Sequence, residues 1–265
     1  MKKINVLIIG IFLVAFPAFF PGCVADKASL KIEKSLPQSK LAYYNDSFDK
    51  LRTDLWEKAG YTYNKAQEAN FKLAKMQIKD GRLWVQTETG CFSKGGLASK
   101  FTLRGDFDIQ LECRIDFLEG IYDMDQYINF LVIEKAKAFG TGNVVFLRLL
   151  KKGGRDFSTI FSGYLDGYLD KGRFHRGDWS KIGNFDGTLR IARIGNKITT
   201  IYRTKKDKQW EDLGTFQSTS NDVGVGFVLQ NFISKRASIT AKAPITATFD
   251  NFRINAAEEI IEEEI

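Results

Sequence analysis

Apolar and polar residues alternate along most of this chain, with a period of two. In the clearest run, Phe107–Phe117, apolar residues occupy every odd position and polar residues every even one. This pattern predicts a β-strand with one buried face. A shift of one residue would bury the polar side chains, so the register should be strongly fixed. We therefore expect a long antiparallel strand whose polar side, with Asp108, Glu112 and Asp116, contacts water.

Two hairpins are predicted where turn residues separate alternating segments. Asp80-Gly81 and Gly195-Asn196 are pairs that favour two-residue hairpin turns. The flanking strands are Lys75–Lys79 with Arg82–Gln86, and Leu189–Ile194 with Lys197–Tyr202. Further strands are expected at Ala98–Leu103, Tyr127–Glu134, Val144–Leu150, Ser158–Tyr164, Val223–Leu229 and Ile245–Ile254. Short helical turns are expected at Asp49–Lys58, Asn64–Leu73 and Ala256–Ile265.

Together these elements predict an all-β fold, an antiparallel β-sandwich of the jelly-roll type. No stretch alternates strands with long helices, so an α/β nucleotide-binding fold is not expected. The hydrophobic content of 44%, with 22 Phe, is enough to fill one core. The expected organisation is a leader at 1–22, a polar tether at 23–42, one sandwich at 43–255 and an acidic tail at 256–265.

The N-terminus predicts export. Met1-Lys2-Lys3 precedes an apolar run to Phe20, which is typical of a secretory signal. Gly22-Cys23 at its end resembles the lipobox of bacterial lipoproteins, although Phe20-Pro21 departs from the usual residues. The resemblance implies lipidation of Cys23 and a membrane-anchored protein facing the periplasm or the cell surface. Cleavage after Ala25 and an uncleaved anchor are the alternatives, and each also places the domain outside the cytoplasm.

The charge and the cysteine content limit the kinds of partner and metal site that we expect. The net charge is +7, but Lys and Arg are scattered, apart from one group at 205–208. Scattered charge solvates a surface, so nucleic acid is not an expected partner. If Cys23 carries lipid, Cys91 and Cys113 remain as two free thiols, which we favour, or as one disulfide. With one His and no Cys-x-x-Cys, zinc is not expected.

Several segments together resemble a known family. They are Asp80–Trp84, Ser99–Phe101, Gly105–Ile109, Gly187–Arg193, Trp210, Val223–Gly226 and Ala247–Ile254. In this order they resemble secreted concanavalin A-like (laminin G-like, jelly-roll) domains, especially poorly characterised bacterial lipoprotein members. This family includes lectins, carbohydrate-binding modules, laminarinase-type glycosidases and keto-disaccharide-cleaving hydrolases. The resemblance implies the fold and leaves the function open, because one fold hosts many functions.

No catalytic residue is predicted. Laminarinase-type enzymes carry Glu-x-Asp-x-x-Glu on one strand, with the carboxyl groups about 5–5.5 Å apart. Asp108, Glu112 and Asp116 share a strand but differ in type and spacing, so a solvated strand face is the expected interpretation. There is no Gly-x-Ser-x-Gly motif, and His175 lies in an expected exposed basic loop.

Two groups of aromatic and polar residues are candidate ligand contacts, because such mixtures suit a saccharide groove. The first comprises Tyr122, Asp123, Asp125, Tyr127 and Asn129, and the second comprises Tyr164, Tyr168 and Trp179. Ordinary loop packing is the alternative for both. No cofactor is expected. A Ca²⁺ site is conceivable at Asp46 and Asp250, but calcium takes 6–8 oxygen ligands and only these two candidates are apparent.

The leading hypothesis is an exported, lipid-anchored β-sandwich that binds carbohydrate. One alternative is a glycoside- or keto-glycoside-cleaving hydrolase with an acidic site that no motif reveals. Another is a structural envelope protein that docks a second protein. The expected partners are a membrane, through the lipid, and a glycan.

Overall fold

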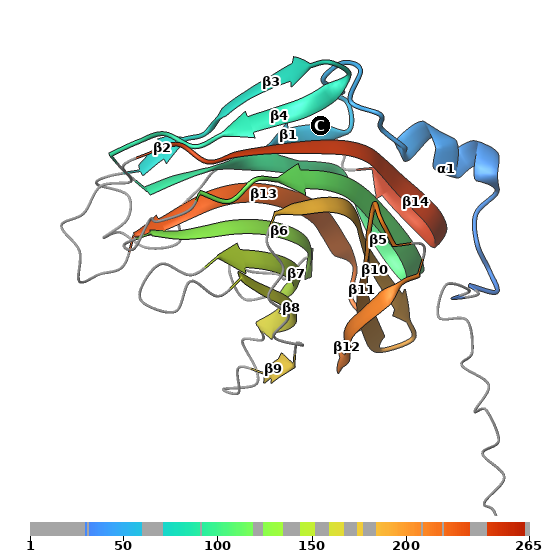
Figure 1. Ribbon diagram of the computed structural model, residues 1–265. Coiled ribbons are helices and arrows are strands. Elements are labelled where there is room, and N and C mark those ends of the chain that lie inside the picture. Colours follow the sequence, from blue (N-terminus) through green and yellow to red (C-terminus); the bar gives the residue numbers. More distant parts are fainter. Residues whose placement is uncertain are drawn as a thin grey trace, which may run out of the picture.

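The computed structural model describes residues 30, 32–59, 71–90, 92–118, 124–134, 144–151, 159–166, 174–176, 184–207, 209–218, 220–233 and 243–262. The leader and Cys23 lie outside these residues. The described elements are α1 (Gln38–Tyr44), β1 (Trp56–Lys58), β2 (Phe71–Leu73), β3 (Lys75–Lys79), β4 (Arg82–Gln86), β5 (Phe92–Ile115), β6 (Met124–Glu134), β7 (Val144–Lys151), β8 (Thr159–Asp166), β9 (Phe174–Arg176), β10 (Phe185–Ile194), β11 (Lys197–Thr204), β12 (Glu211–Gln217), β13 (Val223–Ile233) and β14 (Thr246–Glu262) (Figure 1).

Strand β5, 24 residues long, organises the fold. Residues 94–103 pair with β13, whereas residues 107–115 pair with β10. The change of partner occurs around Gly105, whose φ of 70° favours glycine. A Cβ there would also lie 1.9 Å from a carboxylate oxygen of Glu258. Because the two halves of β5 have different neighbours, one hydrogen-bonded network forms both layers of the molecule.

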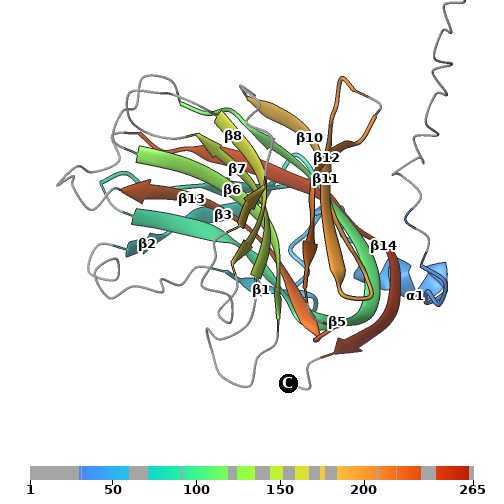
Figure 2. The ribbon, with the colours of Figure 1, turned by 90° about the horizontal axis from the view of Figure 1, so that it is seen from below.

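The two layers are antiparallel apart from one short pairing. One layer continues from β5 through β13, β6, β7, β8 and β9. The other layer contains β10, β11 and β12 on one side of β5, and β14, β4 and β3 on its other side. Seen from below, the β6–β7–β8 and β10–β11–β12 parts stand as separate layers (Figure 2). The exception is β2, which pairs parallel to β5. The predicted all-β sandwich is therefore confirmed.

The core lies between the layers and follows the predicted alternation. The odd positions of β5 from Phe107 to Ile115 are at most 4% exposed. Trp56 is an aromatic centre, with its ring 5.8 Å from Phe101, 5.4 Å from Phe227 and 5.0 Å from Phe252. Its indole N–H donates to Asp46 Oδ2 at 2.8 Å, so the buried polar end of this large side chain is satisfied.

Both ends of the expected domain extend further than the sequence pattern suggested. Residues 256–262 continue β14 and pair with β5, so the expected short helix or free tail is wrong there. Ala257 on this segment is fully buried. At the N-terminal side, α1 packs on β14 with Leu41 fully buried, and Leu36 N donates to Ala257 O at 2.7 Å. The folded part thus begins within the segment expected to be tether.

The other predicted elements agree with the structure to different degrees. Both hairpins are confirmed, as β3–β4 and β10–β11. The segment Asp49–Lys58 contains the expected helical turn, in which Leu55 N and Trp56 N donate to Arg52 O at 3.1 and 2.9 Å, and it then ends in β1. Of Asn64–Leu73, the described part is strand β2. Ala98–Leu103 and Phe107–Phe117 are not separate strands, because β5 runs through both up to Ile115. Across the described residues, no helix has the length and apolar character needed to cross a membrane.

Candidate functional site

Polar side chains gather on the outer side of the β5–β13–β6–β7 layer. Residues directly opposite on adjacent strands point to the same side of a sheet. Lys94 is opposite Gln230, Gln230 is opposite Tyr127, and Asn129 is opposite Arg148. The intervening residues of β6 and β7, such as Ile128 and Leu147, lie in the core. We call the outward group the Tyr127 face: Lys94, Asp125, Tyr127, Asn129, Arg148 and Gln230.

Contacts within the Tyr127 face hold its side chains in place. The Tyr127 hydroxyl donates to Asp125 Oδ2 at 2.9 Å, and Arg148 Nε donates to Asn129 Oδ1 at 2.7 Å. The Arg148 guanidinium carbon lies 5.2 Å from the centre of the Tyr127 ring, within cation–π range. Asn129 is 2% exposed, whereas Tyr127, Arg148 and Asp125 are half-buried. The site therefore consists of partly accessible groups on a buried support.

Two titratable groups of this face have strongly shifted pKa values. Burial lowers the pKa of Lys94 to about 8. Burial also raises the pKa of Tyr127, with further contributions from the charge of Asp125 and the hydrogen bond to it. In each case the environment disfavours the charged form. Shifted titratable groups that lie together are more frequent at functional sites than elsewhere.

An apolar strip adjoins the polar groups. Leu131 and Val228 are 7% and 3% exposed and pack with Ala59, separately from the main core. Gly226 is opposite Leu131, and a Cβ on it would meet Leu131 Cδ1 at 3.3 Å. Because these side chains are almost fully covered, the strip belongs to the packing beside the polar groups.

The structure brings together Asp125, Tyr127 and Asn129 of the first predicted group. Tyr122 and Asp123 lie outside the described residues, as do Tyr168 and Trp179 of the second group. Tyr164 belongs to β8, where its backbone is paired with Phe146 of β7. The sequence reasoning missed Lys94, Arg148 and Gln230. Only Arg148 lies in a strand that the sequence predicted, Val144–Leu150, and no local signal showed the strand order β5–β13–β6–β7.

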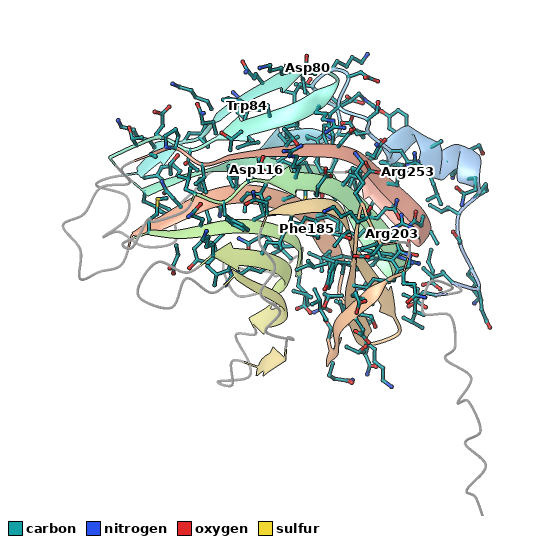
Figure 3. The ribbon with its side chains drawn as sticks, viewed as in Figure 1. Asp80, Trp84, Asp116, Phe185, Arg203 and Arg253 are labelled. Atoms are coloured by element: carbon teal, nitrogen blue, oxygen red, sulfur yellow. The ribbon has the colours of Figure 1, made fainter. Side chains whose placement is uncertain are left out.

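The outer side of the other layer has a different character. Asp108 and Arg190, 2% and 6% exposed, form an ion pair with Arg190 Nε 2.8 Å from Asp108 Oδ1. Trp210 lies nearby, its ring centre 5.3 Å from the Arg190 guanidinium carbon and 4.6 Å from that of Arg203, which Figure 3 labels. The expectation that Asp108 contacts water is therefore wrong. We call this group the Arg190 face: Arg82, Asp108, Glu112, Arg114, Arg190 and Asp250.

The remaining acidic residues of that strand also have partners. Glu112 Oε2 accepts a hydrogen bond from Asn251 Nδ2 at 3.2 Å and lies opposite Asp250 of β14. Burial raises the pKa of Asp250, and the charge of Glu112 adds to this, whereas the charge of Arg82 opposes it. Asp116 forms an exposed ion pair with Arg114 at 3.1 Å.

The remaining candidate positions have structural partners. Asp46 Oδ1 accepts from Phe48 N at 2.8 Å and its Oδ2 accepts from Trp56, so both oxygens are used within the fold. Within the ranges that the structure covers, no group of three His, Cys, Asp or Glu is placed to hold a metal ion. Cys113 is a free thiol in the core, and burial raises its pKa. His175 lies in strand β9 rather than in a loop.

Comparisons with known proteins identify the fold. No protein-family model matches the chain, and no curated protein matches it significantly in sequence. Among solved structures, one from work on endo-acting O-glycanases of the human gut microbiota superposes with a TM-score of 0.60 at 12% identity, covering 83% of this chain and 99% of its own. The Bacillus licheniformis β-glucanase has a TM-score of 0.53 at 12% identity, covering 80% and 96%.

A third similar structure is Rv0315, an immunostimulatory antigen and pseudo β-1,3-glucanase of Mycobacterium tuberculosis. Its TM-score is 0.58 at 10% identity, over 87% of this chain and all of that one. At such identities the likeness shows the fold alone. The chain has the concanavalin A-like glucanase fold, which occurs in proteins named as hydrolases and in one named as a pseudo-enzyme.

Proposed function

We propose that this protein is an exported carbohydrate-binding module that contacts its ligand through the Tyr127 face. The observation that carries the proposal is the arrangement of Tyr127, Asp125, Asn129 and Arg148, held by mutual contacts on the outside of one layer. Support comes from the glucanase fold and from a similar structure of a Zobellia galactanivorans protein in complex with laminaritriose and laminaritetraose, with a TM-score of 0.52 and 12% identity.

The groups of this face suit a sugar. A half-buried tyrosine ring offers apolar surface, while Gln230 and Arg148 carry hydrogen-bond donors. The buried support of Asn129 restrains Arg148 before a ligand arrives, which reduces the entropy lost on binding.

Affinity electrophoresis of the full chain in gels containing polysaccharide tests the proposal, with Tyr127→Ala as the informative variant. We expect polysaccharide to retard the wild type and to retard Tyr127→Ala much less. Tyr43→Ala is a matched control, because Tyr43 also bonds an aspartate, Asp54, and carries an arginine, Arg52, over its ring, but is 52% exposed on α1. A folded protein that no polysaccharide retards would contradict the proposal.

The membrane part of the proposal rests on the leader. We infer cleavage before Cys23 and lipidation of its thiol, because a charged start and an apolar run end at Gly22-Cys23. Mass spectrometry of the mature N-terminus should show an acylated Cys23, and Cys23→Ser should release the protein from the membrane fraction. An unmodified chain that begins at Asp26 would contradict lipid anchoring.

A hydrolase is the second candidate, and one observation favours it. Glu112 and Asp250 are directly opposite on adjacent strands, and the pKa of Asp250 is raised. Opposed residues place their Cβ atoms about 4.5–5.5 Å apart, so the two carboxyl groups share one side of the sheet, as the paired carboxyl groups of a glycosidase must. Product release from a mixed glycan panel that disappears in Glu112→Gln would support this candidate, whereas release unaffected by the substitution would reject these residues.

A further inference from the structure

We infer that a second surface of the sandwich, centred on Trp84, binds uncharged polysaccharide. This surface consists of Gln77 on β3, Trp84 and Gln86 on β4, and Thr246 and Thr248 on β14, and we call it the Trp84 surface. It shares no residue with the Tyr127 face, so the inference goes beyond the proposed function and does not depend on it.

The Trp84 surface lies on the outer side of the layer that contains β3, β4 and β14. Leu83 and Val85, the neighbours of Trp84 along β4, are buried in the core, so the Trp84 side chain leaves the other side of the strand. Gln77 and Thr248 are directly opposite Trp84 and point the same way. Trp84 lies at the top of Figure 3, whereas β6 and β7 lie lower in the same view in Figure 1, so the two surfaces are on opposite sides of the molecule.

Trp84 differs from the other two tryptophans that the structure describes. Trp56 is in the core with its N–H bonded, and Trp210 lies beside the guanidinium groups of Arg190 and Arg203. Trp84 is half-buried, and within the described ranges it has no hydrogen bond, ring contact or cation–π contact. The fold therefore does not use its indole N–H, and part of its ring remains in contact with water.

The polar groups around this ring suit a sugar. Gln77 is exposed, and the amide of Gln86 and the hydroxyls of Thr246 and Thr248 are half-buried. Amides and hydroxyls both donate and accept hydrogen bonds, as the hydroxyls of a sugar do, and an indole ring offers a flat apolar face with a polar end. Gln86 Nε2 donates to Thr246 Oγ1 at 3.3 Å, which restrains both side chains before a ligand arrives. A protein partner would need a wider apolar centre than this one aromatic ring.

The charges beside the Trp84 surface favour an uncharged ligand. Three cations on β3 and β4 flank it, and two of them are paired. Arg82 Nε lies 3.2 Å from Asp250 Oδ2, and Lys75 Nζ lies 3.4 Å from Glu88 Oε1. Of these three cations, Lys79 alone has no carboxylate partner among the described residues. An anionic chain would therefore gain little from this surface, whereas the ring and the neutral polar groups are available to a neutral one.

Affinity electrophoresis of the full chain tests the inference, in gels that contain laminarin, xyloglucan, galactomannan, starch or polygalacturonate. We expect at least one of the four neutral polysaccharides to retard the wild type, with little change as salt is raised, because no ion pair is made. Trp84→Thr should lower the apparent affinity about tenfold. Threonine is a good strand former, so β4 should be retained. Trp84→Phe should keep part of the affinity, because a ring remains.

Two matched variants and a local signal make the test specific. Lys79→Gln removes the unpaired cation, and Tyr43→Ala removes a ring that is 52% exposed on α1, so both should be retarded like the wild type. Circular dichroism and urea unfolding verify that each variant is folded. The change in tryptophan fluorescence on adding the neutral polysaccharide should largely disappear in Trp84→Phe, which ties the contact to this ring even if Trp84→Thr does not fold.

The outcomes separate this inference from the proposed function, because each variant removes the contact on one side of the molecule and leaves the other. Retardation of folded Trp84→Thr equal to that of the wild type would overturn the inference, whereas Tyr127→Ala in the same gels tests the Tyr127 face. Stronger retardation by polygalacturonate than by every neutral polysaccharide, reduced in Lys79→Gln, would overturn the choice of an uncharged ligand. A folded wild type that no polysaccharide retards would overturn both proposals.

Discussion

The two outer faces of the sandwich hold their arginines in different ways. On the Arg190 face, Arg190 is paired with Asp108, Arg82 with Asp250 and Arg114 with Asp116. On the Tyr127 face, Arg148 donates to a neutral amide, Asn129, and lies over an aromatic ring. An arginine opposite a carboxylate is largely neutralised by it, whereas the amide of Asn129 and the ring of Tyr127 carry no formal charge. The first arrangement serves the fold, and the second suits a ligand.

The two faces also differ in how deeply their charged side chains are buried. The Asp108–Arg190 pair is almost fully buried, with further hydrogen bonds from Asn255 to Asp108 and Gln110. A buried pair must be satisfied by the protein itself, because no water reaches it. The half-buried groups of the Tyr127 face remain within reach of a partner. Three predictions test this contrast, from the largest expected effect to the smallest.

Removing one partner of the buried pair should have the largest effect. Asp108→Ala leaves the Arg190 charge without its partner in a buried position, and we expect the free energy of unfolding to fall by about 3–5 kcal/mol. Urea denaturation measures the change. Glycan affinity, extrapolated to the folded fraction, should be unaltered. A loss under about 1 kcal/mol would show that the Arg190 face is not structural in this sense.

Lys94 should make stability depend on pH. Its folded pKa of about 8 lies below its ordinary value of 10.5, so the unfolded chain binds more protons between these values. Stability should therefore rise as pH increases, by about 1–2 kcal/mol between about pH 7.5 and 9.5, and fall again as pH drops towards the folded pKa. Urea denaturation of wild type and Lys94→Met isolates the contribution. Parallel pH profiles for the two proteins would contradict it.

Arg114→Ala should have the smallest effect. The pair with Asp116 is more than half exposed on both sides, and such pairs contribute about 0–1 kcal/mol. We expect a change in unfolding free energy of less than about 0.5 kcal/mol and no change in glycan affinity. A clear loss of affinity would place the ligand on the Arg190 face instead and would favour the hydrolase candidate.

Much of the fold follows from local pattern. The hairpins around Asp80-Gly81 and Gly195-Asn196 were predicted with correct turns, because these turn types are specified by the residues themselves. The end of β14 was not, because residues 256–262 alternate poorly and become a strand by pairing with β5. Likewise α1 gains its buried face only from contact with β14.

For the site, the sequence pointed to Asp125, Tyr127 and Asn129, which are close together on one strand. Lys94, Arg148 and Gln230 come from three other strands, and they meet Tyr127 only through the order β5–β13–β6–β7. That order joins residues more than a hundred positions apart, such as Lys94 and Gln230, and no short-range pattern encodes it. The supposed water-facing side of Phe107–Phe117 was misjudged at Asp108 for the same reason.

By itself the sequence determined the all-β character, the side of Phe107–Phe117 that enters the core and the tight turns. These properties depend on neighbouring residues, on the period of two and on turn chemistry. Only the tertiary structure decided which arginine meets a carboxylate and which meets an amide and a ring. That choice depends on which strands lie side by side and on how deeply each side chain is buried, and both arise when the chain folds as a whole.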